Sequence, residues 1–335
     1  MKNTSKRSNF YMKIISNKDF ASFFTLIVLW ILFYLLNPSF LNLNNLSVLF
    51  TVIPIYGIVV LGVTLLMISG EFDLSVAATF ALIPLISDFL ITSGLNVVFS
   101  IIVGLFVAAL IGLLNGMIVI KSGIPSFIVT LGTLFVWLGV ALQISGGQPH
   151  SFNLPISTRN ILVGSIGFNG LINSQLIWLI ILGVLFYLIL ERHQWGNWIY
   201  AIGGNKDAAR AMGIRVDLVK ISLFMLTAIL AGFAGIMESA LYSQVIANQG
   251  GNLELDSIAA AVIGGTSLFG GEGSVIGGII GTIIIWSIEN GLILAGVSSY
   301  VYETLIGALI IIVVIIHRYA KKAGKNVRLG DINEQ

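Results

Sequence analysis

Two pairs of carboxylates stand out because the residues around them are apolar. Glu71 and Asp73 lie two positions apart in the stretch LLMISGEFDLSVAATFAL, and Glu254 and Asp256 have the same spacing in ELDSIAAA. An unpaired charge inside a membrane is costly, so acids in such a setting are candidates for a functional site. Carboxylates there can bind a proton or a cation, contact a polar solute, or cap a helix.

Helix capping is the structural interpretation of the two Asp residues. Asp73 precedes LSVAATFAL and Asp256 precedes SIAAAVIGG. Asp is a favoured N-cap, and its charge complements the positive end of the helix dipole. We therefore predict that both Asp residues cap broken helices. It stays open whether these ends, together with Ser75, Glu71 and Glu254, also contact a solute or whether the two Glu residues are simply solvated at a membrane boundary.

The composition places these acids in a polytopic membrane protein. The chain has 335 residues, of which 57% are hydrophobic and 10% charged, and it has no cysteine. Soluble domains carry roughly 25% charged residues. We predict an all-α fold of about ten transmembrane helices, since a spanning helix needs about 20 apolar residues. The predicted spans are 20–36, 46–69, 74–93, 97–120, 124–145, 174–190, 218–242, 257–268, 274–294 and 299–316.

The positions of the basic residues predict the orientation. With ten crossings and a cytoplasmic N-terminus, all but one of the 17 Lys and Arg residues fall on the cytoplasmic side. The exception is Arg159. This agrees with the excess of Lys and Arg in cytoplasmic loops. We expect a cytoplasmic tail over residues 1–19, one transmembrane domain over 20–317 with a first span that is retained, and a cytoplasmic tail over 318–335.

The eighth predicted span is too short to cross a membrane as a helix. Twelve residues cover about 18 Å, whereas the hydrocarbon core is about 30 Å thick. We predict a half helix continued by irregular backbone in GGTSLFGGEGSVIGG, which begins at Gly264. Such backbone is tolerated at membrane depth where it is buried in protein or lines a cavity. Gly264, Gly265 and Thr266 are therefore candidates for a translocation path; the alternative is a short helix under an interfacial glycine loop.

The two halves of the chain resemble each other. EFDLSVAA at Glu71 matches ELDSIAAA at Glu254, and NGMIV at Asn115 matches NGLIL at Asn290, in the same order. Five spans per half is an odd number, so repeats over about 20–145 and 174–317 must have inverted topology. Inverted repeats with discontinuous helices are typical of transporters.

The loop over residues 191–217 is the largest one predicted on the cytoplasmic side. Asn205 can cap a short helix in KDAARAMG, Gly213 can end it, and Gly203 and Gly204 allow a sharp entry. A helix this short needs a docking surface on its own protein or on a partner.

These segments together resemble a known family. The stretches that carry the resemblance, within residues 46–316, are GEFDLSV, KSGIPSFIVTLGTL, GGNKDAARAMGI, LDSIAAAVIGGTSLFGGEGSVIGG and NGLILAGVSSY. They are similar to sugar-importing ABC transporter permeases of the ribose/xylose/galactoside type. The resemblance implies a channel-forming subunit, in a bacterial cytoplasmic membrane, that moves a monosaccharide or similar small polar solute.

The resemblance also implies partners. A second permease copy would complete the channel, an ATPase would dock below it, and a periplasmic or lipid-anchored binding protein would deliver the sugar. It assigns one shared role to several loop residues, which would form a coupling helix that fits a groove on the ATPase. They are Gly203, Gly204, Asn205, Ala208, Ala209 and Gly213.

The chain lacks the motifs of several other activities. It has no G-x-x-x-x-G-K-[ST] phosphate loop, so we expect ATP and Mg²⁺ to bind the partner subunit and no cofactor to bind this chain. His150, His193 and His317 are scattered, no catalytic arrangement is evident, and no nucleic-acid partner is expected. The alternative function is an ion-coupled secondary transporter that uses Glu71, Asp73, Glu254 and Asp256.

Overall fold

Long apolar helices make up most of the computed structural model, which describes residues 18–298, 301–302, 304–308 and 311. Six of them are long and apolar enough to cross a membrane. These are α3 (Leu43–Ile68), α5 (Val97–Ser122), α6 (Ser126–Ser145), α8 (Ser174–Arg192), α11 (Val216–Tyr242) and α13 (Val275–Leu294). The protein is therefore an all-α polytopic membrane protein, as predicted.

Three further helices fall on predicted spans but are shorter or less regular. They are α2 (Lys18–Leu36), α4 (Val76–Thr92) and α12 (Leu253–Ile263). Most of the predicted tenth span, 299–316, lies outside the described residues, as do most of the predicted N-terminal tail and all of the C-terminal tail. The count of ten spans therefore stays a prediction.

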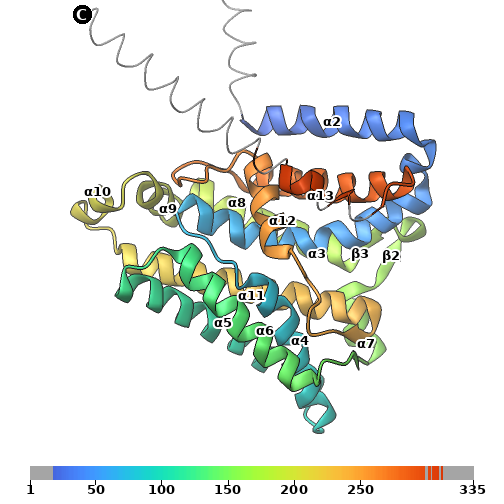
Figure 1. Cartoon of the computed structure of the whole chain (residues 1–335), viewed down its shortest axis with the longest axis horizontal. Helices are drawn as coiled ribbons and strands as arrows, with labels where there is room; N and C mark the ends of the chain where they lie inside the picture. Colours follow the sequence, from blue (N-terminus) through green and yellow to red (C-terminus); the bar gives the residue numbers. More distant parts are fainter. Residues whose placement is uncertain (1–17, 299–300, 303, 309–310, 312–335) are drawn as a thin grey trace, which may run out of the picture.

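Helices α3 and α11 form the centre of the molecule. In the most apolar window of each, 72% of the residues of α3 and 61% of those of α11 are buried, against 17% in α6. Helix α5 packs along α11, and α13 packs along α3 (Figure 1). Helices α2, α6 and α8 cover this centre and expose large apolar side chains, as expected of surfaces that face lipid or another apolar protein surface.

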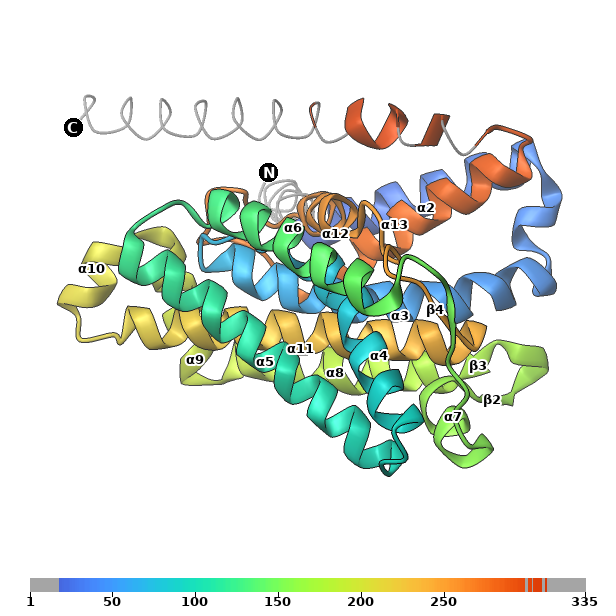
Figure 2. The same ribbon diagram turned by 60° about the horizontal axis from the view of Figure 1, so that its bottom comes forward.

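Short elements gather at the two ends of the bundle. One end holds α7 (Ile156–Val163), the 3₁₀ turn η2 (Phe168–Gly170) and two small antiparallel pairs; the other holds α9 (Gln194–Gly204) and α10 (Lys206–Ala211) (Figure 2). The pairs join β1 (His150–Ser151) to β4 (Gln244–Val245) and β2 (Ser165–Gly167) to β3 (Ile172–Asn173). A 3₁₀ turn, η1 (Pro38–Leu41), links α2 to α3.

Local chemistry accounts for where the helices begin and bend. The side chains of Asn96 and Asn173 accept hydrogen bonds from the first free N–H groups of α5 and α8. Pro54 lies inside α3 and cannot donate to the carbonyl of Phe50. The Nδ2 atom of Asn173 donates to that carbonyl at 2.9 Å instead, so the break in α3 is closed by the start of α8.

The predicted half helix is present. Helix α12 has only 11 residues, and irregular backbone runs from Gly264 to the cap of α13 at Ser274. We call residues 264–274 the α12–α13 linker. It lies next to α9 at the α10 end of the bundle, since a Cβ atom on Gly271 would lie 3.0 Å from the backbone of Gly204.

Candidate functional site

Asp73 belongs to a buried polar cluster at the start of α4. Its Oδ1 atom accepts hydrogen bonds from the N–H of Ser75 at 2.9 Å and from the Ser75 hydroxyl at 2.6 Å. The Nδ2 atom of Asn115, on α5, donates to the same hydroxyl at 2.8 Å. All three residues are buried. Asp73 thus accepts from an N–H two positions ahead, in the turn that precedes the helix. The N-cap of α4 is Ser75 and the regular helix begins at Val76, so the prediction that Asp73 is the cap is off by two residues.

Glu71 forms a buried ion pair with Lys220, near the start of α11. Both side chains are almost fully covered by protein. The pair joins the segment between α3 and α4 to a helix that lies far away in the sequence. The sequence did not reveal it, because Lys220 was identified only as a basic residue of the cytoplasmic side.

Asp256 does not cap α12, so this part of the capping prediction is wrong. The helix begins at Leu253 with Asn252 as its N-cap, and Glu254 and Asp256 lie in the first turn. Acids in a first turn are favoured by the helix dipole just as a capping acid is, so the sequence pattern does not distinguish the two positions. The Oε2 atom of Glu254 is buried without a hydrogen-bond partner among the described residues.

The α12–α13 linker returns to the helix bundle through very close backbone contacts. A Cβ atom on Gly264 would lie 2.1 Å from the carbonyl oxygen of Gly277, so only glycine fits there. Gly265 follows in the left-handed region with a φ of 95°. Thr266 is fully buried, and its hydroxyl has no partner in the described part of the chain. Of the three predicted path residues in this segment, Thr266 is the one with a polar side chain to offer.

Three glycine-containing segments meet at the α10 end of the bundle. The N–H of Gly271 donates to the carbonyl of Ile68, at the end of α3, at 2.8 Å. Gly203 of α9 packs on that hydrogen bond, since a Cβ atom there would lie 1.8 Å from the Ile68 oxygen. Gly270 lies against Gly70 and Gly203 in the same way. We call these contacts the glycine junction; they fix α9 on the end of α3 and on the linker.

The short helix predicted in the loop over residues 191–217 is present. The Oδ1 atom of Asn205 accepts hydrogen bonds from the N–H groups of Asp207 and Ala208, at 3.1 and 3.0 Å. Gly213 ends the turn that follows, with a φ of 83°. Gly203 and Gly204 are the last residues of α9 and neither has a left-handed conformation, so the predicted sharp entry is wrong. Only Gly203 needs its small size.

The two alanines of α10 face different ways. Ala208 and the neighbouring Met212 are exposed, with 78% of Met212 accessible, whereas Ala209 is only 2% exposed. Ala209 therefore packs on its own protein, and the expectation that it faces a partner is wrong. Asn205, Ala208 and Gly213 remain on the outside.

Helix α10 is tied to the buried ion pair through α11. The guanidinium of Arg210 pairs with Asp217 at 2.6 Å, and Lys220 follows one helical turn later on α11. The hydroxyl of Tyr200, on α9, donates to the carbonyl of Gly273 in the linker at 2.8 Å. The α9–α10 unit therefore contacts α3, the linker and α11 at once.

The sequence of most of the chain matches a known family. The family of branched-chain amino acid transport system permease components matches residues 45–314. The chain belongs to this family. The permease is thus a transport component, in line with its apolar helices.

Curated relatives cover most of the permease. A xylose/arabinose import permease protein of Sulfolobus acidocaldarius is 34% identical over 327 residues, 95% of this chain and 89% of that protein. A ribose import permease protein of Bacillus subtilis is 35% identical over 301 residues, 88% of this chain and 91% of that protein. A probable ABC transporter permease protein of Escherichia coli is 33% identical over 289 residues, 86% of either protein. No solved structure matches the permease.

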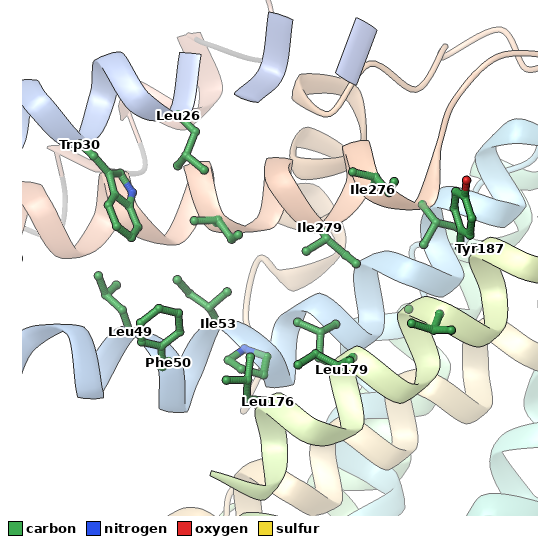
Figure 3. Close-up of a pocket in the computed structure, with 16 residues that line it drawn as sticks. Leu26, Trp30, Leu49, Phe50, Ile53, Leu176, Leu179, Tyr187, Ile276 and Ile279 are labelled. Carbon is green, nitrogen blue, oxygen red and sulfur yellow. The ribbon is translucent and has the colours of Figure 1, made fainter. Parts of the chain in front are cut away.

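A wide groove of the permease offers no polar group to a solute. It has a volume of 580 Å³ and lies between α2 and α13 on one side and α3 and α8 on the other (Figure 3). Its wall is apolar, with residues such as Leu49, Ile53 and Leu179, and the indole N–H of Trp30 already donates to Ser287. The predicted path residues lie elsewhere.

Sequence reasoning missed an aromatic stack near the middle of the permease. The ring of Tyr56, on α3, stacks on Trp286 of α13 at 4.5 Å between centroids and on Phe80 of α4 at 6.1 Å. Glu238 of α11 lies beside the Tyr56 hydroxyl. The available signal was Glu238 itself, a lone acid inside the apolar run 218–242.

Proposed function

We propose that the permease is the membrane subunit of an ATP-driven importer for a monosaccharide or a similar small polar solute. The relatives that cover most of its length are named as import permeases for ribose and for xylose and arabinose. A third relative, which matches this chain over 86% of either protein, is named as a probable ABC transporter permease. ATP hydrolysis is assigned to a partner subunit, because this chain has no phosphate loop.

The observation that carries the proposal is the build of the α9–α10 unit. Its outer surface presents Ala208 and Met212, while Gly203 and Ala209 fix its inner surface on the permease. A partner that binds this outer surface can move the α9–α10 unit, whose backbone is in direct contact with α3 and with the α12–α13 linker. A coupling helix requires both a free surface and a stiff connection of this kind.

The helix arrangement supports a channel built from two inverted repeats. In the proposed repeats, α3 corresponds to α11 and α5 corresponds to α13. Helix α5 packs on α11, and α13 packs on α3, so each repeat places its fourth helix on the second helix of the other. The shorter helices α4 and α12 also correspond, as expected for discontinuous helices beside a path. Ten crossings with both termini in the cytoplasm, in a bacterial inner membrane, complete this proposal.

Two further partners belong to the proposal. A second permease copy would cover the exposed apolar faces of α5 and α6. A periplasmic or lipid-anchored sugar-binding protein would dock at the end that holds α7 and the small strands. The ion-coupled alternative is less well supported, because Glu71 is neutralised by Lys220 and Asp73 is engaged with Ser75.

The test is a charge placed on the outer surface of α10. Ala208→Glu should abolish co-purification with the cognate ATPase subunit and ATP-dependent uptake of D-ribose and D-xylose, because a buried unpaired charge at a docking surface is costly. Ile156→Glu, at an exposed site on the opposite end, should leave co-purification with the ATPase unchanged. Normal ATPase binding and uptake in Ala208→Glu would contradict the coupling role of α10.

A further inference from the structure

An aromatic and acidic cluster lies between the central helices of the permease. It consists of Tyr56, Phe80, Glu238, Trp286 and Glu289, and we call it the aromatic–carboxylate cluster. Its three rings form one continuous stack, with Tyr56 between the other two. Both acids interact electrostatically with the Tyr56 hydroxyl. The cluster thus joins side chains of α3, α4, α11 and α13.

The cluster lies where the two shorter helices meet. Phe80 is in the first turns of α4, and a Cβ atom on Gly250, just before α12, would lie 2.9 Å from its ring. Tyr56 and Trp286 are near the middle of α3 and α13. Transporters of inverted-repeat architecture bind their solutes near the membrane midplane, beside discontinuous helices. The position of the cluster therefore fits a solute path.

Two polar atoms of the cluster and its surroundings have no hydrogen-bond partner. The Oε2 atom of Glu238 and the hydroxyl of Tyr302 are buried without a hydrogen bond to any described residue. Tyr302 is only 9% exposed, and it interacts with Asp256 and Glu289. Buried polar groups are normally hydrogen-bonded, so these atoms call for a ligand that supplies donors.

The chemistry of the cluster fits a neutral sugar. Flat aromatic faces can cover the C–H faces of a sugar ring, and carboxylates accept hydrogen bonds from hydroxyl groups. The acids disfavour an anionic solute. A metal ion is a poor fit, because no three acidic or His side chains converge on a metal-sized site within the described residues. A cavity of 140 Å³ borders Trp286, Glu289 and Asn290, so the cluster is open at Trp286 and Glu289.

We propose that the aromatic–carboxylate cluster is where a neutral monosaccharide contacts the permease during passage, with Trp286 against its ring and Glu238 accepting from its hydroxyls. This assignment rests on the proposed function and names the site at which it is carried out.

The experiment uses the complete importer, reconstituted in proteoliposomes that contain ATP. Its binding protein delivers radiolabelled D-ribose or D-xylose from the outside, and uptake into the vesicles is measured. Trp286→Leu and Glu238→Gln should lower the maximal uptake rate about tenfold, in line with the loss of one ring contact or one charge-assisted hydrogen bond. Trp286→Phe should stay within about threefold of the wild type, since it keeps a ring. Tyr56→Phe removes only a hydroxyl and tests the polar contact without disturbing the stack.

The matched control is Trp178→Leu, which removes an aromatic side chain that packs on Phe233 outside the cluster. Each variant must bind the ATPase like the wild type. If wild-type uptake requires ATP but the cluster variants transport like Trp178→Leu, the site assignment is wrong and the proposed function stands. If the wild type with ATP imports neither of these sugars nor any other monosaccharide or small polar solute that its binding protein binds, both are wrong. Uptake that a protonophore abolishes at constant ATP would mean that the acids bind a coupling ion, which also overturns the sugar site.

Discussion

At the scale of single residues, three of the acids that stood out in the sequence are each compensated in a different way. Glu71 is paired with Lys220, Asp73 accepts from Ser75, and Asp256 lies in the first turn of a helix. The charges at these positions therefore have a structural role that does not depend on transport. Two substitutions separate this work from ion coupling.

Replacing Lys220 by Met should destabilise the permease strongly, by about 3–5 kcal/mol, because it leaves Glu71 buried without a partner. The double variant Glu71→Gln/Lys220→Met removes both charges and should recover most of that loss. Thermal unfolding of the purified protein in nanodiscs measures both. Equal stability of Lys220→Met and the wild type would mean that the pair contributes nothing.

Asp73→Asn should retain both stability and sugar uptake. An Asn oxygen can accept from the same Ser75 groups, and Asn caps helices about as well as Asp. Asp73→Ala leaves the buried Ser75 donors without their acceptor and should cost about 1–3 kcal/mol. Uptake and thermal unfolding of both variants test this. If Asp73→Asn folds normally but does not transport, Asp73 carries a proton or a cation after all.

At the scale of elements, the glycine junction turns three separate segments into one rigid contact. Gly203→Ala should displace α9, since no room exists between its Cα atom and the Ile68 carbonyl. We expect a loss of about 1–3 kcal/mol, as is typical of overpacking, together with reduced coupling of ATP hydrolysis to uptake. Gly204→Ala is the matched control, because nothing lies within 4 Å of a Cβ atom there. Identical stability and coupling in the two variants would refute the role of the junction.

The sequence predicted elements best where local chemistry decides them. Asn205 and Gly213 mark the ends of the α10 turn because an Asn cap and a left-handed glycine act within a few residues. The break after Ile263 follows from the glycines that come next. The start of α12 was placed too late because Asp256 is as compatible with a first turn as with a cap.

Contacts between distant segments were beyond the sequence. Nothing near Glu71 indicates Lys220, and no local pattern places Tyr56 against Trp286. The prediction that Ala209 faces a partner is wrong for a related reason. Ala208 and Ala209 are equally small, and only the packing of the loop on the bundle decides which one is buried.

At the scale of the whole molecule, the proposed topology assigns opposite sides of the membrane to the two ends of the bundle. The permease has no cysteine, so single cysteines can be labelled without background. Lys206→Cys should react with an impermeant maleimide only in inverted vesicles, and Gln148→Cys only in intact cells or spheroplasts. Both positions are exposed. Reversed labelling would refute the orientation and the inverted repeats with it.

The burial of Ala209 has a consequence for how quickly and how tightly the partner is recognised. Because α10 is held by its own protein, its shape exists before any encounter, and docking need not order it. Preorganised surfaces lose less conformational entropy on association. A synthetic peptide of residues 203–214 lacks that support and is too short to stay helical in water. It should therefore compete poorly with the intact permease for the ATPase, even though it contains every residue of the contact surface.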